Sequence, residues 1–341
     1  MNDGMNMDRG MSGPMWIPVE PPTLEGLLAW HPQPYAIFPI LCALLVGLYA
    51  VGLVRLWRRD IHWPIGRTVS WLVGVAMVLW VTATGIEGYG MAMFSVHMFQ
   101  HMILTMLAPV FLLMGAPVTL MLRALPAGRG RRAAPRRALV WLLHSPIAKV
   151  GAHPAFTLSL FVFSLYGVYF TPIFDTLMSS VWGHYLMLLH FVITGVVFFG
   201  PVLMVDPWPG TKNHLIRMML MMAGLPFHAF FAIAVMMSPG PIVRFFASPP
   251  PSWNVDIIDD QLWAGGLTWV FGDIPTIVVM IVLAVLWMRS DDRLARRTDR
   301  KAERDGDAEL NSYNAYLQRL ADHEAAVLET GGRPTPFAVK R

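Results

Sequence analysis

The chain has 341 residues, of which 55% are hydrophobic and only 14% are charged, and its formal net charge is +4. This composition is too apolar for an ordinary soluble protein, so it indicates a polytopic membrane protein. The single cysteine, Cys42, excludes an internal disulfide and any multi-cysteine metal site, so a metal site here would depend on histidine, methionine and carboxylate.

Residues 1–34 are predicted to form a flexible extracytoplasmic tail. This segment carries Met5, Met7, Met11 and Met15 among Asn, Gly, Asp and Pro, a composition that buries little apolar surface. Because soft thioethers bind Cu(I), a metal-scavenging role is an alternative to an ordinary disordered tail. No cleavable signal peptide is recognisable, and the first apolar segment is therefore expected to act as the insertion signal.

Seven apolar stretches of about 20 residues predict an all-α transmembrane domain over residues 35–288. They cover residues 35–56, 68–87, 96–122, 154–171, 182–204, 214–238 and 261–288. The fourth is the shortest. The third contains Pro109, Gly115 and Pro117, which predict a kinked helix because proline frees backbone carbonyls and bends the axis.

Basic residues are concentrated in alternate loops. Arginine and lysine follow the first, third, fifth and seventh segments, whereas the N-terminus and the other loops are mostly acidic. The positive-inside rule then places the N-terminus outside and the C-terminus in the cytoplasm. The net positive charge is explained by this topology and by lipid headgroups, and it calls for no nucleic-acid partner.

Three segments outside the spans have distinct compositions. Residues 123–153 are basic, with an apolar patch at 139–143 that predicts an interfacial helix on the cytoplasmic face. The proline-rich loop 239–260 is expected to form an ordered extracytoplasmic cap. Residues 289–341 form a polar cytoplasmic tail, and apolar residues at helical spacing between Leu310 and Leu320 predict that it is partly helical.

The candidate site begins with two histidines at the outer end of the third span. His97 and His101 lie four residues apart, and therefore on one helix face, and an uncharged apolar segment follows them. Ionisable side chains in a bilayer are costly and usually functional. Met98 and Met102 lie beside them, and imidazole with thioether is a ligand set suited to copper. The alternative is a pair of interfacial histidines bonded to water.

Further polar residues are predicted at similar depths. From the rise per residue, His190 lies about 12 Å below the outer edge, His228 roughly 15 Å and Asp273 about 18 Å. His190 is a candidate third ligand, with a structural histidine as its alternative. His228 and Asp273 are predicted to form a buried pair that either supports ligands or serves structure alone, and Asp260 and Gln261 open the seventh span as further supporting residues. His184 is expected to be solvated at the interface.

Several stretches together resemble a known family. They are the segment from His97 to Leu104 with Ala108-Pro109 and Met114–Leu120; His190–Pro201 with Asp206-Pro207; Asp260–Gly266; and Gly272–Pro275 followed by Arg289–Arg297. In their order along the chain they resemble the seven-span CtaG-type assembly proteins associated with caa-type cytochrome c oxidases. The resemblance covers about residues 35–300. It excludes the methionine-rich N-terminus and the end of the tail.

The resemblance implies a non-enzymatic factor of the bacterial plasma membrane that assists maturation of cytochrome c oxidase, by handling copper for its CuB centre. Oxidase subunits and lipid would be its partners, and copper, as Cu(I), its metal. Two alternatives come from the residues alone: a haem-binding enzyme or electron carrier with axial histidines between helices, and a copper permease. The sequence leaves the oligomeric state undetermined.

Overall fold

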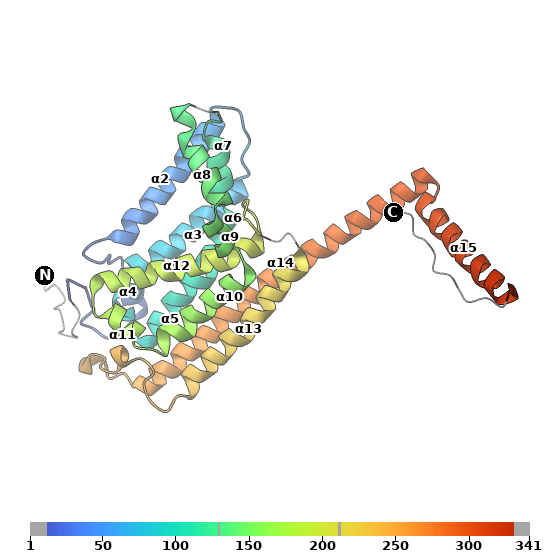
Figure 1. Cartoon of the computed structure of the whole chain (residues 1–341). Coiled ribbons are helices and arrows are strands. Elements are labelled where there is room, and N and C mark those ends of the chain that lie inside the picture. Colours follow the sequence, from blue (N-terminus) through green and yellow to red (C-terminus); the bar gives the residue numbers. More distant parts are fainter. Residues whose placement is uncertain (1–11, 129, 211–212, 331–341) are drawn as a thin grey trace. The chain divides into compact units, whose positions relative to one another are not determined.

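The computed structural model describes residues 12–330, apart from residues 129, 211 and 212 (Figure 1). Within this part of the chain every regular element is a helix, and the predicted all-helical class is confirmed. The chain divides into two compact units, Met1–Leu283 and Ala284–Arg341. All of the predicted site residues belong to the first unit.

Six helices in the described residues are long and apolar enough to cross a membrane. They are α2 (Ile37–Trp57), α3 (Ile65–Ala83), a composite helix (Phe94–Ala124), α12 (Val181–Leu203), α13 (His214–Met237) and α14 (Ile257–Asp305). Each of them coincides with one predicted segment. The remaining predicted segment forms a shorter apolar helix over Pro154–Gly167, built from α10 (Pro154–Val162) and the π-helical turn η3 (Phe163–Gly167).

The outward faces of these helices are apolar. On α2, large side chains at helical spacing are exposed, among them Ile40, Leu44, Leu48 and Val51. An exposed apolar stripe of this length is unusual on a soluble monomer, and it is the expected surface of a helix in contact with lipid. The described helices therefore have the composition of a multi-pass membrane protein.

The composite helix consists of four pieces: α5 (Phe94–Met102), the π-helical turn η1 (Ile103–Leu107), α6 (Ala108–Met114) and α7 (Pro117–Ala124). The predicted kink is confirmed between α6 and α7, where Ala116 has φ 51°. The Gly115 carbonyl at this break accepts a hydrogen bond of 2.9 Å from the Tyr49 hydroxyl. A backbone group freed by the kink is thus satisfied by a neighbouring helix.

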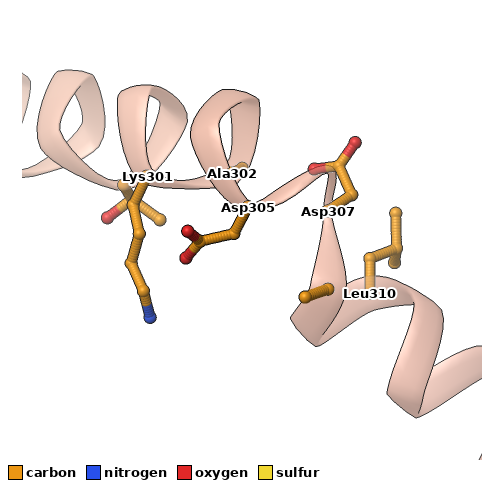
Figure 2. Close-up of a pocket in the computed structure, with 7 residues that line it drawn as sticks. Lys301, Ala302, Asp305, Asp307 and Leu310 are labelled. Carbon is orange, nitrogen blue, oxygen red and sulfur yellow. The ribbon is translucent and has the colours of Figure 1, made fainter.

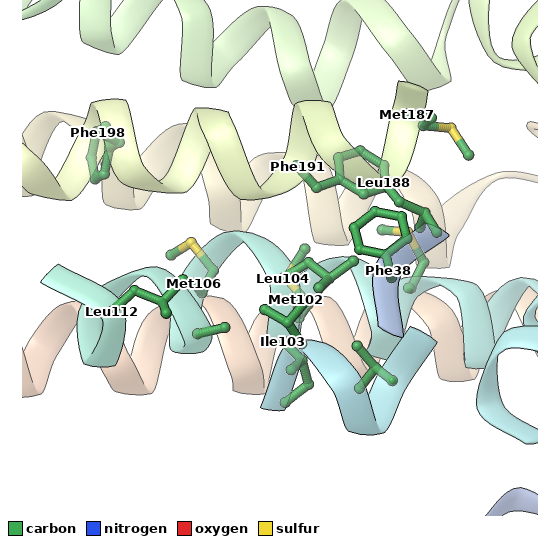
Figure 3. Close-up of a cluster of buried hydrophobic side chains, with 14 of the residues drawn as sticks. Phe38, Met102, Ile103, Leu104, Met106, Leu112, Met187, Leu188, Phe191 and Phe198 are labelled. Atoms are coloured by element: carbon green, nitrogen blue, oxygen red, sulfur yellow. The ribbon is translucent and has the colours of Figure 1, made fainter. Parts of the chain in front are cut away.

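Helix α12 packs along η1 and α6. Gly195 makes this close approach possible, because a Cβ there would collide with the Thr105 carbonyl oxygen. Figure 3 shows Phe191 and Leu188 of α12 facing Met102 and Leu104 across the buried layer between the two helices. The helix that carries the candidate histidines is therefore held tightly at the centre of the bundle.

The N-terminal segment departs from its predicted flexibility from residue 12 onward. Met15 and Ile17 are buried, and the Gln33 side chain exchanges hydrogen bonds of 2.8 and 3.1 Å with the Trp16 backbone. The prediction was wrong for this stretch, because its few apolar side chains find a partner surface on the bundle. Met5, Met7 and Met11 lie outside the described residues.

Short helices connect the spans. They are α1 (Leu24–Leu28), α4 (Gly85–Gly90), η2 (Arg131–Ala133), α8 (Ala134–His144), α9 (Pro146–Gly151), α11 (Ile173–Met178), η4 (Arg244–Phe246) and η5 (Pro251–Trp253). Helix α8 matches the helix predicted around residues 139–143, and its Trp141 is exposed. In the proline-rich loop, Trp253 is buried and donates a hydrogen bond to the Val19 carbonyl, as expected for an ordered cap.

The second unit contains the end of α14 and helix α15 (Ala308–Thr330), so the predicted helical part of the tail is confirmed. A hollow of about 280 Å³ lies at the bend between them and is lined by Lys301, Asp305 and Asp307 (Figure 2). Its lining contains no histidine, methionine or cysteine. We therefore assign it no part in metal chemistry.

Candidate functional site

His97 and His101 are joined by one tyrosine hydroxyl. The Tyr169 oxygen lies 3.0 Å from His97 Nε2 and 2.9 Å from His101 Nδ1. All three side chains are fully buried. The two histidines come from adjacent turns of α5, and Tyr169 comes from the residues directly after η3. Local π-helical turns occur often at functional sites, and one lies on each side of this cluster.

Aromatic rings enclose both imidazoles. His101 stacks on Phe191 with ring centroids 3.8 Å apart, and His97 meets Phe174 edge-on at 5.1 Å. Two ring nitrogens, His97 Nδ1 and His101 Nε2, have no hydrogen-bond partner. Buried polar atoms are rarely left unpaired, so these two need a reason, and a bound cation is one.

The bridging hydroxyl couples the protonation of the two rings. A tyrosine hydroxyl has one proton to donate, and a neutral imidazole has one donor and one acceptor nitrogen. If Tyr169 donates to one histidine and accepts from the other, only one of the two unpaired nitrogens carries a lone pair. Both carry one only when both rings donate to the Tyr169 oxygen, which can accept two hydrogen bonds.

The neighbouring thioethers are also buried. Met98 and Met102 have no exposed surface, and the same is true of Met91 on the preceding segment. Soft sulfur in a dry environment suits Cu(I) and also suits irregular core packing. Met98 and Met102 remain predicted ligands, since they lie next to the two histidines on the same helix.

His190 lies in a different polar group. Its Nε2 is 3.1 Å from the Ser164 hydroxyl and 3.5 Å from the Thr194 hydroxyl, and its side chain is only partly buried. No hydrogen bond or ring contact joins it to His97 or His101. Within residues 12–330, with their gaps, no three His, Cys, Asp or Glu side chains form a group that could hold a metal. The predicted set of three histidines is thus not assembled in this conformation.

Asp260 caps the helix that carries the histidine pair. Its carboxylate accepts hydrogen bonds from the Phe94 and Ser95 backbone N–H groups, at 2.6 and 3.3 Å, and from the Ser95 hydroxyl. These are the first residues of α5. Gln261 holds the adjacent loop through the Ile242 N–H and the Gly240 carbonyl. Both predicted supporting residues therefore position neighbouring backbone.

Asp206 caps the start of α7, the last piece of the same composite helix. It accepts hydrogen bonds from the backbone N–H groups of Val118 and Thr119, at 3.2 and 2.7 Å, and from the Thr119 hydroxyl at 2.6 Å. These residues open α7. Two of the aspartates in the family motifs, Asp260 and Asp206, thus cap the first and the last piece of the third span.

His228 and Asp273 form the predicted pair, with 3.6 Å between His228 Nδ1 and Asp273 Oδ1. His228 is buried and its ring lies directly against Gly272, where any Cβ would overlap it. Neither side chain has a hydrogen-bond partner for these atoms. The pair lies on α13 and α14, and among the described residues no hydrogen bond joins it to the Tyr169 bridge.

Glu87 and His184 form a second carboxylate–histidine pair, fully buried, that the sequence did not predict. His184 Nε2 lies 2.8 Å from Glu87 Oε1, and both side chains are 0% exposed. The expectation of a solvated His184 was wrong, because α4 folds over the start of α12 and brings the carboxylate to it. The residues are 97 positions apart, so no local pattern could have paired them. Tyr169 was missed for the same reason.

A sequence profile described as the cytochrome c oxidase caa3 assembly factor family (Caa3_CtaG) matches residues 47–290 of the chain. The chain belongs to this family. The match contains the third span, Tyr169, both capping aspartates and His190. The resemblance seen in the motifs is therefore confirmed.

Curated proteins of mycobacteria are similar to this Caa3_CtaG family member. An uncharacterized protein of Mycobacterium bovis is 42% identical over 305 residues, which are 89% of this chain and 46% of that protein. One of Mycobacterium leprae is 43% identical over 283 residues, 82% of this chain and 43% of that protein. The chain thus spans less than half the length of these relatives. No solved structure matches it.

Proposed function

We propose that this protein is a non-enzymatic assembly factor for cytochrome c oxidase in the bacterial plasma membrane, and that copper for the oxidase is its cargo. Family membership supports the assembly role, since the family is described by it. The apolar helices support a membrane location. Oxidase subunits would then be its protein partners.

The observation that carries the copper proposal is the buried pair His97 and His101. Each ring uses one nitrogen for Tyr169 and keeps the other unpaired. Neutral imidazole nitrogens are good Cu(I) ligands, and removal of water from the site favours a soft cation of low charge over Mg²⁺ or Ca²⁺. Met98 or Met102 would supply thioether, and His190 would join only after a movement of α12 or α5.

The first experiment is a Cu(I) competition titration of purified protein against a calibrated chromogenic chelator. We expect the variant with His97→Ala and His101→Ala to lose at least tenfold in affinity, because both imidazole ligands are gone. His62→Ala is the control, since His62 is an exposed loop histidine. Absence of binding by the natural chain, or unchanged binding by the double variant, would refute the copper proposal.

A second experiment separates copper from haem. After deletion of the gene, the oxidase should retain its haem and lose copper if the factor delivers metal to CuB. Loss of haem, or a Soret absorption band in the purified protein, would instead favour the haem-binding alternative.

A further inference from the structure

A second cluster of soft and charged groups lies beside the histidine pair, at the junction of α4, α11 and the start of α12 (Figure 1). His184 is at its centre. One ring nitrogen, Nε2, faces the Glu87 carboxylate at 2.8 Å, and the other, Nδ1, faces the Met178 thioether sulfur at 3.3 Å. Glu87, Met178 and His184 are all 0% exposed.

Glu87 is positioned from its other side by Gln100. The Gln100 amide donates to the second carboxylate oxygen and to the Val81 carbonyl, at 2.8 Å to the latter. Gln100 lies on α5 between His97 and His101. In the described structure neither Lys nor Arg pairs with Glu87, so its side-chain partners there are the Gln100 amide and the His184 ring.

The contact between His184 and Met178 lacks a donor when the histidine is neutral. With its proton on Nε2, donated to Glu87, the imidazole presents a lone pair at Nδ1. A thioether sulfur is only an acceptor. Two lone pairs then face each other at 3.3 Å in a dry interior, an arrangement that a cation bound by both atoms would stabilise.

We propose that His184 and Met178 are ligands of a soft monovalent cation, Cu(I) in the cell, and that Glu87 orients the histidine for this role. A carboxylate that accepts the distal N–H of a metal-ligating histidine is a recurrent arrangement, because it fixes the tautomer and raises the basicity of the ligating nitrogen. Imidazole with thioether selects Cu(I) over hard cations. The inference rests on the proposed copper function for the identity of the cation, but it concerns different residues.

This second site also differs in position from the first. Met178 ends α11 and His184 lies in the first turn of α12, so both are close to the connecting segments at one end of the bundle. His97 and His101 are linked to it through Gln100 and Glu87. A cation held at Met178 and His184 would thus lie on the loop side of the Tyr169 bridge.

The test is X-ray absorption of Cu(I)-loaded protein together with chelator competition. We expect a sulfur neighbour of copper in the natural protein. In the background of His97→Ala and His101→Ala, which removes the first site with its thioethers, Met178→Leu keeps the side-chain volume and should remove this sulfur neighbour and lower the remaining Cu(I) affinity at least tenfold. Glu87→Gln should lower the affinity by about 10- to 100-fold, because it removes the carboxylate that orients His184. Met221→Leu, at an equally buried methionine of α13, should change neither.

Two outcomes would overturn this site: no sulfur neighbour in the natural protein, which needs no variant to be folded, or a sulfur neighbour that persists when Met178→Leu is combined with His97→Ala and His101→Ala. In either case His184 and Met178 would not be copper ligands. The variant with His97→Ala and His101→Ala should retain the sulfur neighbour. The two failures can therefore be told apart. Unchanged Cu(I) affinity after His97→Ala and His101→Ala contradicts the proposed function, whereas an unchanged sulfur neighbour after Met178→Leu in that background contradicts the second site.

Discussion

At the scale of single residues, Tyr169 sets the state of the histidine pair. Its hydroxyl satisfies one nitrogen of each ring, and it is as deeply buried as they are. A metal can be bound by both histidines only if both rings donate a hydrogen bond to the Tyr169 oxygen, because the other nitrogen of each ring then presents a lone pair. The tyrosine thus holds the rings in place and also selects between the tautomer that binds metal and those that do not.

Removal of this hydroxyl should destabilise the protein and weaken metal binding. Tyr169→Phe leaves His97 Nε2 and His101 Nδ1 without their shared partner, and an unsatisfied buried polar group costs about 1–3 kcal/mol. We expect a lower midpoint of thermal unfolding in detergent and a lower Cu(I) affinity in the chelator competition.

Tyr166→Phe provides the matched control. Tyr166 donates to the Phe227 carbonyl at 2.8 Å from a half-buried position and touches neither histidine. It should lower stability slightly and leave Cu(I) affinity unchanged. If both variants bound Cu(I) as the natural chain does, Tyr169 would be a packing residue only.

At the scale of helices, the first and the last piece of the third span are each capped by a carboxylate from elsewhere in the chain. Asp260 caps α5 and Asp206 caps α7, and the break at Gly115 and Ala116 separates the two caps. A carboxylate at a helix N-terminus accepts free N–H groups and interacts favourably with the helix dipole. One cap thus acts on the piece with the histidines and the other on the piece beyond the break.

The two caps should have separable effects. Asp260→Ala and Asp206→Ala should each lower stability by about 0.5–2 kcal/mol, the usual cost of a lost cap. Only Asp260→Ala should also weaken Cu(I) binding, because α5 begins three residues before His97. Thermal unfolding and chelator competition on both variants check this. Equal loss of Cu(I) affinity in both would show that α5 is not positioned independently of α7.

The sequence predicted the helices far better than their contacts. An uncharged apolar run identifies a helix by its length, and Pro109 and Pro117 identify its kink, because these signals are local. The partners of the histidines are not local: Tyr169 is 72 positions from His97, and Glu87 is 97 from His184. Only the folded chain brings them together, and for that reason Asp260 could be foreseen as a supporting residue but not as a cap of α5.

At the scale of the whole bundle, contacts at its two ends determine how the chain runs. The start of α12 meets α4 through His184 and Glu87, and the end of α12 meets α7 through Asp206. The third span ends with α7 at one end of the bundle, and α12 starts at the opposite end of the bundle. Residues between Ala124 and Val181 therefore return along the bundle, although Pro154–Gly167 covers only about 21 Å against a hydrocarbon thickness of about 30 Å.

This return predicts seven crossings, with the N-terminus outside and the C-terminus in the cytoplasm. Because Cys42 is the only native cysteine, a Cys42→Ala background allows single cysteines to be placed at exposed positions by His62→Cys, Ser252→Cys and Ser312→Cys. In right-side-out vesicles a membrane-impermeant maleimide should label only the variant at position 252. The other two should react after permeabilisation. Labelling of positions 62 and 252 from the same side would mean that Pro154–Gly167 does not cross, and an inverted pattern would reverse the orientation inferred from the basic loops.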